Sequence, residues 1–344
     1  MTSRHTRLCC KLSIGFFLSF VISGTALNAE VEALSPNEMG KIMVLMYHDI
    51  GDRETTWRRT PDNLERDLEA LNQRGYVPIS LTDFVRGRIR VPRGKSPIVI
   101  TFDDGHPGQF QWAKSKYLPG EIKKPSEKSA VGILKKYHEA HHDFPARATF
   151  FLHGKRPFGE KKQLEEKLSY LIANQMDIGN HSTQHQNLGK KSLQNPELIQ
   201  RAIGGQAMFL TGIISAKYPH YKIETYALCY GRRPRPRYQR FLHKGTFNNF
   251  NYTNIAILNV GSGPAYSPFD NRFRPQAIPR IRASEINTFG TGLYDWLRYF
   301  DENPNERYIS DGNDVEVTVP RPAVKWINKR FFADVDYKIK KVVR

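Results

Sequence analysis

The feature that most constrains this chain is a run of apolar and β-branched residues, Ile98 to Phe102, followed at once by Asp103, Asp104 and Gly105. Such a run, without alternating polar residues, is typical of a parallel strand that is buried on both faces. Loops that follow such strands commonly carry functional side chains. The sequence therefore predicts a central strand that delivers two adjacent carboxylates to one edge of a parallel sheet.

Further predicted strands alternate with amphipathic helices. We expect strands at 41–48, 77–81, 148–152, 176–179, 226–228, 255–261 and 316–319, and helices at about 61–74, 129–141, 161–174 and 195–210. Thr60 is a candidate N-cap for the first of these helices, with Pro61 at its first position. The alternation favours an α/β fold with parallel pairing and right-handed crossovers. We expect a single domain over residues 30–344, with 262–344 as an irregular C-terminal extension.

His181 and His185 follow the strand expected at 176–179. Residues spaced four apart share one face of a helical turn. Taken alone, such a pair is usually a pair of surface imidazoles, and Asp103 and Asp104 alone could be a turn whose acids bond local amides. Together, one carboxylate and the two imidazoles can hold a divalent ion while the second carboxylate acts on water. The combination favours a hydrolytic metal site.

These segments resemble a known family. Thr101 to Gly105 and His181 to His185 are similar to the first two motifs of the NodB-homology polysaccharide deacetylases, a carbohydrate esterase family. Residues 146–152 resemble the family's second core strand, and 226–231 resemble its third motif. The resemblance covers roughly residues 42–285. It implies a distorted (β/α) barrel of the polysaccharide deacetylase type, with the site at the C-terminal ends of the strands.

The resemblance also implies a role for each motif residue. Asp104, His181 and His185 would be the metal ligands, with zinc as the default ion and cobalt or nickel as alternatives. Asp103 would be the general base, because neighbours in an extended chain point in opposite directions and one can ligate while the other faces water. The backbone N–H of Tyr230 would stabilise the oxyanion, the alternative being an ordinary turn after a strand.

The sequence departs from the family pattern in three places. Cys229 stands where the family usually has proline, and the arginine that commonly orients the base is not evident. The family's late histidine, a general acid, is missing after Leu258, since the strand continues Asn259-Val260-Gly261. We hypothesise that His48, at the end of the first strand, is the general acid, with a water molecule as the alternative.

Residues outside the motifs receive no assigned role. His106 can touch substrate because it lies beside the carboxylates. Tyr47, Trp112, Phe158 and Tyr266 can stack on sugars, but each is more often explained by core or loop packing.

The charge balance points to a basic surface. The chain has 52 basic and 34 acidic residues and a net charge of +18, which favours a polyanionic neighbour. The densest basic cluster, residues 232–237, lacks the interleaved aromatics or motif of a nucleic-acid module. We expect a solvated surface that can contact an anionic wall polymer, and no nucleic-acid partner.

The first residues indicate export. Arg4, Arg7 and Lys11 precede an apolar run at 12–27 with small residues near its end, which predicts a signal peptide at 1–29. An uncleaved membrane anchor is the alternative, although the run is shorter than the roughly 20 apolar residues that span a bilayer. We expect a secreted, periplasmic or cell-envelope protein. Only Cys229 would remain after cleavage, which excludes an internal disulfide in the mature form.

These expectations define a function. The chain is expected to hydrolyse the N-acetyl groups of an N-acetylglucosamine-containing polysaccharide, a linear amide, with release of acetate. Peptidoglycan is the leading substrate, followed by chitin-like chains and exopolysaccharides. Two alternatives remain: a metal-dependent O-acetyl carbohydrate esterase, and a non-catalytic glycan-binding relative, which Cys229 and the missing late histidine favour.

Overall fold

A computed structural model describes residues 34–114, 123–261, 263–333 and 338–342. These described residues form one compact unit. The signal peptide expected at 1–29 lies outside the described residues, so the proposed division of the chain stays a prediction. Within the described residues, no helix combines the length and apolar character needed to cross a bilayer.

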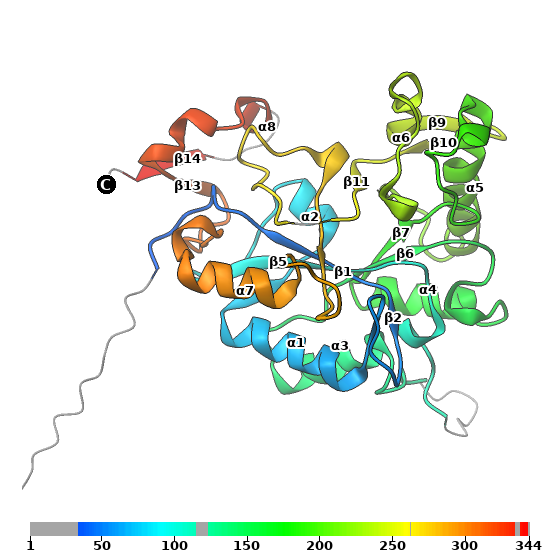
Figure 1. Cartoon of the computed structure of the whole chain (residues 1–344), viewed down its shortest axis with the longest axis horizontal. Coiled ribbons are helices and arrows are strands. Elements are labelled where there is room, and N and C mark those ends of the chain that lie inside the picture. The colour runs from blue at the N-terminus through cyan, green and yellow to red at the C-terminus, as the bar shows by residue number, and fades with distance from the viewer. Residues whose placement is uncertain (1–33, 115–122, 262, 334–337, 343–344) are drawn as a thin grey trace, which may run out of the picture. The chain divides into compact units, whose positions relative to one another are not determined.

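The centre of this unit is a curled parallel sheet of eight strands (Figure 1). The strand order is β11-β8-β7-β6-β5-β1-β12, and β4 pairs with β5 beside this path. The strands are β1 (Met43–Tyr47), β4 (Tyr76–Pro78), β5 (Ser96–Phe102), β6 (Thr149–Leu152), β7 (Asp177–Asn180), β8 (Thr225–Ala227), β11 (Ala256–Leu258) and β12 (Ile281–Arg282). The predicted α/β class with parallel pairing is therefore confirmed.

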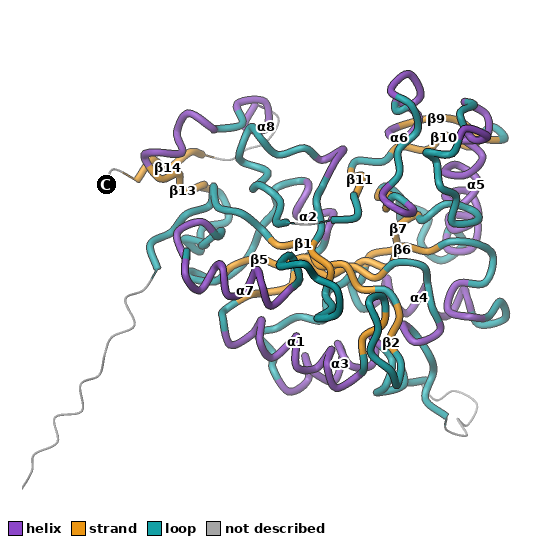
Figure 2. The backbone as a smooth tube through the Cα atoms, in the orientation of Figure 1, coloured by secondary structure: helices purple, strands orange, loops and turns teal. Residues whose placement is uncertain are grey.

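Alternate strand residues face two hydrophobic layers. On β1, Met43 and Leu45 belong to a layer shared with helices, whereas Val44 belongs to a second layer on the opposite face. The first layer includes α1 (Pro61–Gln73), α3 (Ala130–Ala140), α4 (Leu164–Ala173) and α5 (Pro196–Ile214). The second includes α2 (Leu81–Val85) and residues of the C-terminal extension. Figure 2 shows helices on both sides of the strands.

Local sequence signals explain where the first helices begin. The Thr60 hydroxyl accepts a hydrogen bond from the Asn63 N–H at 3.2 Å, and Pro61 occupies the first turn of α1. Ser129 caps α3 in the same way, through the Gly132 N–H. These side chains satisfy N–H groups that have no partner within the helix. The predicted N-cap at Thr60 is confirmed.

The last strand is shorter than predicted. We expected 255–261, but β11 ends at Leu258. Beyond it, the Asn259 N–H bonds to the Ile278 carbonyl at 2.8 Å. A Cβ atom at Gly261 would lie 1.6 Å from the Arg280 carbonyl oxygen, so only glycine allows this approach. The pattern at 259–261 thus reflects packing against a later segment and not a continued strand.

That later segment, residues 278–283, joins the two edges of the sheet. The Ile278 N–H bonds to the Ile257 carbonyl at 2.9 Å, and the Ala283 N–H bonds to the Met46 carbonyl at 3.1 Å. Between these contacts, β12 pairs in parallel with β1. Arg280 is therefore held between the two ends of the curled sheet.

Smaller elements complete the unit. They are β2 (Asp49–Ile50) paired with β3 (Arg58–Arg59), α6 (Arg240–His243), the antiparallel hairpin of β9 (Lys244–Phe247) and β10 (Phe250–Thr253), α7 (Leu293–Glu302), α8 (Lys329–Ala333), and the parallel pair of β13 (Glu316–Pro320) and β14 (Lys338–Val342). The strand predicted at 316–319 is confirmed as β13.

A buried glutamate ties the start of the described chain to this extension. Glu38 is 2% exposed. Its carboxylate accepts hydrogen bonds from the Thr318 N–H at 2.7 Å and from the Tyr308 hydroxyl at 3.0 Å. Burial, the largest influence, together with the nearby charge of Asp311, raises the pKa of Glu38 to about 7.

This glutamate should make stability depend on pH. The pKa of Glu38 rises from 4.5 to about 7 on folding. The contribution of Glu38 to the unfolding free energy is therefore fully present below pH 4.5 and is lost as the pH rises through 7. The difference corresponds to about 3 kcal/mol. We expect Glu38→Gln to show a smaller fall in unfolding free energy between pH 4.5 and 8 than the wild type, measured by urea denaturation. Glu302→Gln, a change at an exposed residue, is the control and should show the same fall in unfolding free energy as the wild type. If Glu38→Gln also showed that fall, Glu38 would not be the source of the pH dependence.

Candidate active site

The candidate residues lie at the C-terminal ends of adjacent parallel strands. His48 follows β1, Asp103 and Asp104 follow β5, and His181 follows β7. Neighbouring parallel strands all end on the same edge of a sheet, so residues far apart in sequence converge there. His153 after β6 and Cys229 after β8 lie on the same edge.

Asp104, His181 and His185 converge on one point. The Asp104 Oδ1 atom lies 3.2 Å from His181 Nε2 and 3.3 Å from His185 Nε2. This oxygen is buried and has no hydrogen-bond partner among the described residues. Ligands held tetrahedrally at the usual zinc distances are about 3.3 Å apart. The three donors therefore fit a divalent metal ion with at least one open position.

Neighbouring groups orient two of these ligand candidates. The His181 Nδ1–H donates to the Ala227 carbonyl at 2.9 Å, which turns the Nε2 lone pair towards Asp104. The other Asp104 oxygen lies 3.1 Å from His106 Nε2. Burial alone would raise the pKa of Asp104, but the hydrogen bond from His106 and the nearby His181 imidazole lower it well below the usual range. Asp104 is therefore ionised, as a metal ligand must be.

His181 shows that negative charge is concentrated here. Burial opposes protonation, but the surroundings of the ring, which include Cys229 and the carboxylates of Asp103 and Asp104, raise the pKa of His181 overall. A proton and a metal cation compete for the same imidazole nitrogen. The site thus favours a positive charge at the point where the three donors meet.

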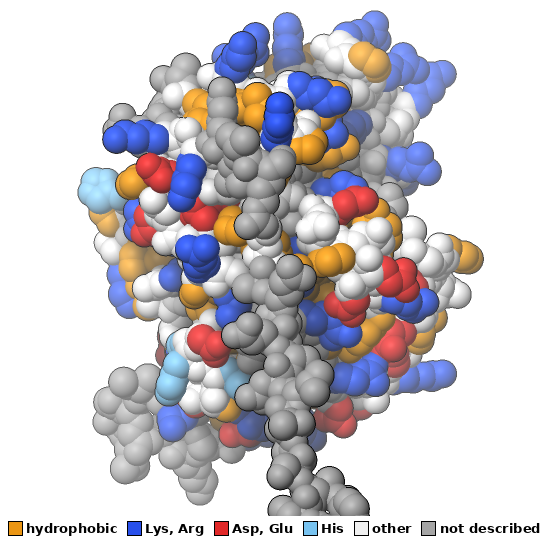
Figure 3. All heavy atoms as spheres, turned by 90° about the vertical axis from the view of Figure 1, so that its left-hand side faces the viewer, with side chains coloured by type: hydrophobic (Ala, Val, Ile, Leu, Met, Phe, Trp, Pro, Cys, Tyr) orange, Lys and Arg blue, Asp and Glu red, His pale blue; other side chains and the backbone are white. Residues whose placement is uncertain are grey.

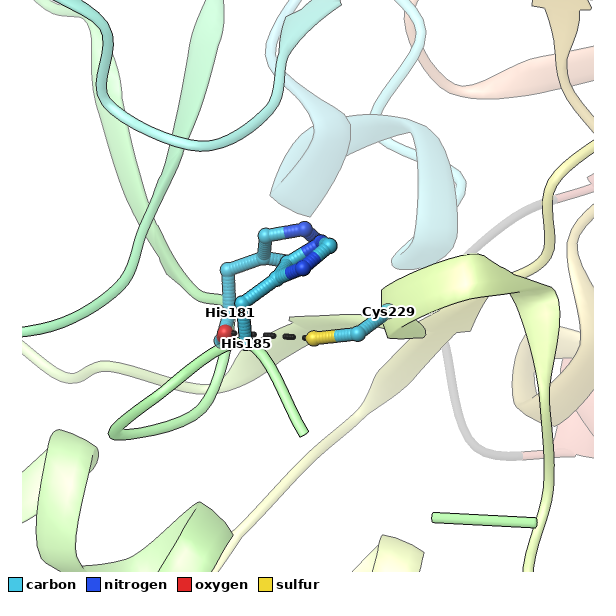
Figure 4. Close-up of side chains that lie close together, drawn as sticks. All are labelled: His181, His185 and Cys229. Carbon is cyan, nitrogen blue, oxygen red and sulfur yellow. Dashed lines mark hydrogen bonds between the residues drawn. The ribbon is translucent and has the colours of Figure 1, made fainter. Parts of the chain in front are cut away.

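Cys229 lies beside the same imidazoles (Figure 4). One donor atom each from Cys229, His181 and His185 lie within 4.8 Å of one another, which makes a second possible ligand set. The Cys229 thiol, however, already donates to the His181 carbonyl at 3.3 Å. The distances of 3.2 and 3.3 Å from Asp104 to the two imidazoles match tetrahedral coordination, so we favour Asp104 as the third ligand. Cys229 then supports the turn that carries His181.

Asp103 is held by a fully buried arginine. Arg280 Nη1 and Nη2 donate to the two Asp103 carboxylate oxygens at 2.7 and 2.6 Å. Arg280 also bonds to the Asn259 carbonyl at 2.8 Å and lies 3.2 Å from the Thr101 hydroxyl. Burial would raise the pKa of Asp103, but the charge of Arg280 lowers it. Each oxygen keeps a second lone pair, so the carboxylate can still accept a proton.

Arg280 is the arginine that the sequence did not reveal. The sequence shows no arginine before the motif at 226–231 that could orient Asp103. In the structure this arginine is Arg280, which lies in the segment that joins the sheet edges, 177 positions after Asp103. In the sequence, Arg280 stands in Ile278-Pro279-Arg280-Ile281, two residues before a second arginine, Arg282. Nothing local distinguishes it from the other basic residues of the chain.

Two further histidines border the site. Burial, the largest influence, lowers the pKa of His48 to about 4, although the charges of Asp103 and Asp104 act in the opposite direction. His153 was missed by the sequence analysis; its ring lies 5.5 Å from that of His185, and burial lowers its pKa to about 4 as well. Both imidazoles are therefore neutral at pH 7. Their roles remain predictions.

Tyr230 lies at the exposed rim. Its ring is 4.5 Å from that of His185, and the residue is 60% exposed. Its amide belongs to the leading N–H groups of the 3-10 turn Cys229–Gly231, which have no partner inside the turn. The oxyanion role of this amide, which the resemblance implies, stays a prediction.

Backbone strain is concentrated in these loops. Asp104, Ser182, His185 and Tyr230 all have positive φ angles, between 50° and 78°. Non-glycine residues adopt this region uncommonly, and such strain clusters at functional sites. The surrounding hydrogen bonds, such as Ser182 N–H to Asn180 Oδ1 at 2.9 Å, hold the turns in place.

Comparisons with known proteins agree with this geometry. Residues 90–221 match the family model described as polysaccharide deacetylase, a range that contains Asp103, Asp104 and His181. No curated protein matches the chain. The match confirms the predicted resemblance to the NodB-homology polysaccharide deacetylases over these residues, and it supports the predicted enzyme class.

Several solved structures are similar to this chain. The deacetylase PplD of Streptococcus pyogenes, in complex with acetate, is 19% identical with a TM-score of 0.50, and the match covers 75% of this chain and 99% of that one. IcaB from Ammonifex degensii is 16% identical with a TM-score of 0.47, over 72% of this chain and 93% of that one. The likeness to PplD confirms the distorted (β/α) barrel.

Loss of Arg280 should affect both folding and turnover. Arg280→Gln leaves the buried Asp103 carboxylate without its ionic partner, so we expect a loss of about 3–5 kcal/mol in unfolding free energy. We expect kcat for acetate release to fall about 100-fold, because the carboxylate is no longer oriented. Denaturation and steady-state kinetics measure the two effects.

Arg272→Gln is the matched control, since Arg272 makes a similar two-bond pair with the buried Asp270 outside the site. It should lower stability without lowering kcat. Should Arg280→Gln not fold, Arg280→Lys keeps the charge but loses the two-bond geometry. Folded Arg280 variants with wild-type kcat would refute the role.

Proposed function

We propose that this protein is a metal-dependent deacetylase that removes N-acetyl groups from an N-acetylglucosamine-containing polysaccharide of the cell envelope. The observation that carries the proposal is the convergence of Asp104, His181 and His185 at 3.2–3.3 Å beside an ionised, unligated Asp103. A metal site next to a free carboxylate is the arrangement that hydrolysis of an acyl bond requires.

The ligand candidates would hold the ion, zinc by default and cobalt or nickel as alternatives. When bound, such an ion supplies Lewis-acid chemistry to the acetamide carbonyl and to water. Asp103 accepts the proton of the attacking water. The Tyr230 N–H donates to the oxygen on which negative charge develops. The carbon–nitrogen bond then breaks, and the products are acetate and a free amine.

The leaving nitrogen must receive a proton, and His48 is our candidate for delivering it. With a pKa of about 4 this imidazole is neutral at pH 7. A neutral imidazole must first take up the proton released from water before it can pass one on. We therefore assign His48 as a proton relay and not as a general acid that is already protonated before the reaction.

The substrate assignment depends on charge and on predicted export. The sequence pattern of residues 1–29 supports a secreted, periplasmic or envelope location, where N-acetylated glycans occur. Figure 3 shows lysine and arginine side chains spread over one face of the protein, in keeping with the net charge of +18. Such a surface attracts an anionic wall polymer. Peptidoglycan is therefore our leading substrate.

Acetate release from defined glycans tests the proposal. We expect wild-type protein to release acetate from peptidoglycan or N-acetylglucosamine oligomers, with loss of activity in chelator and recovery on addition of zinc or cobalt. Asp103→Asn should lower kcat at least 100-fold, because the base is removed. Asp62→Asn, a change of an exposed aspartate on α1, is the control.

Other outcomes select the alternatives. Acetate from ester-linked sugars alone would make the protein an O-acetyl esterase. No acetate from any substrate, with glycan binding retained in the presence of metal, would make it a non-catalytic glycan-binding relative.

His48 and His153 should respond differently to substitution. If His48 relays the proton, His48→Ala should lower kcat about 100-fold, whereas His153→Ala should have a smaller effect. The two imidazoles have similarly lowered pKa values, so each serves as a control for the other. Steady-state kinetics on one N-acetylglucosamine oligomer decides: near wild-type kcat in His48→Ala would remove His48 from the mechanism, and a larger loss in His153→Ala would transfer the role.

A further inference from the structure

Trp57 is an exposed tryptophan next to the candidate site. It is 46% exposed, whereas the other three tryptophans, Trp112, Trp296 and Trp326, are half-buried. A large apolar ring in water is unfavourable, and an exposed aromatic beside a site commonly contacts a ligand. Trp57 is not among the four aromatic residues that the sequence suggested as candidates for sugar stacking.

The loop that carries Trp57 is fixed at both ends. The Trp57 carbonyl accepts a hydrogen bond from the Asp49 N–H at 3.1 Å. The next residue, Arg58, pairs with the Asp49 carboxylate at 2.7 Å. Arg59 then forms a buried ion pair with Asp67, with Nη2 2.6 Å from Oδ1. The indole is therefore presented by an ordered backbone, which lowers the entropy lost when a ligand binds.

The indole contacts the candidate proton relay directly. Its ring lies 4.7 Å from that of His48 and is tilted by 58°. The Arg282 guanidinium lies 5.2 Å from the ring centre. Both neighbours restrict the ring, while nearly half of the residue's surface stays open to solvent.

A second exposed aromatic borders the site through a different histidine. Tyr230 contacts His185 and is 60% exposed. Trp57 thus contacts His48 after β1, and Tyr230 contacts His185 after β7. The reacting carboxylates, Asp103 and Asp104, act electrostatically on His48 as well as on His185.

We propose that Trp57 is a sugar-stacking platform that positions the glycan for deacetylation, with an adjoining pyranose ring lying on the indole face. The apolar C–H face of a hexosamine suits a flat aromatic surface, and the Arg282 guanidinium beside it can donate hydrogen bonds to sugar hydroxyls. This inference rests on the proposed function and names Trp57 as the residue that favours polymers over single sugars.

Kinetics on oligomers of graded length test the platform. We expect Trp57→Ala to raise KM about tenfold for a tetramer of N-acetylglucosamine, with a smaller effect for the dimer and a smaller effect on kcat than on KM. Trp57→Phe, which keeps an aromatic face, should recover most of the affinity. Phe289→Ala is the control, because Phe289 is 91% exposed and its loss should leave KM unchanged.

Binding measured without turnover separates this inference from the proposed function. In an Asp103→Asn background, calorimetry with the tetramer should give a Kd about tenfold higher when Trp57→Ala is added. If wild-type protein released no acetate but this difference were present, the deacetylase proposal would fail and the platform would stand. Unchanged KM and Kd would overturn the platform. So would a fall in kcat with KM unchanged, since Trp57 would then only support His48.

Discussion

The pairing of Asp103 with Arg280 is the interaction on which the rest of the site depends. A carboxylate at the end of β5 is buried where ionisation is unfavourable, and a buried cation with two donors is the main group that keeps it charged. Arg280 can reach it because residues 278–283 bond to both edges of the curled sheet. The segment that closes the sheet therefore also keeps Asp103 ionised. Gly261 is needed for this arrangement, because a side chain there would collide with the Arg280 backbone.

The local part of this structure could be predicted from the sequence. The apolar run before Asp103 predicted β5, and Thr60 and Pro61 predicted the start of α1. The two histidines do converge on Asp104, but the predicted helical turn is wrong, because residues 181–185 form a bend with positive φ angles at Ser182 and His185. The signals for β5 and α1 lie within a few residues, and the physics that produces them is local: burial on both faces of a strand, or a capped N–H group.

What the sequence did not reveal comes from contacts between distant segments. Arg280, His153 and Trp57 each follow or border a strand whose neighbour is set by the sheet order and not by sequence proximity. No spacing rule distinguishes Arg280 from the other arginines, because its role is defined by a carboxylate 177 positions earlier. The shortening of β11 has the same origin, since residues after Leu258 bond to the segment that carries Arg280.

The late position of Arg280 bears on how the protein matures during synthesis. A ribosome releases β1, β5, β6 and β7 well before the segment at 278–283, so the nascent chain exposes an unpaired Asp103 until that segment emerges. Such a carboxylate favours water over a dry interior. The pocket should therefore form late in translation, and a chain truncated before residue 278 should retain many helices yet lack a competent catalytic centre.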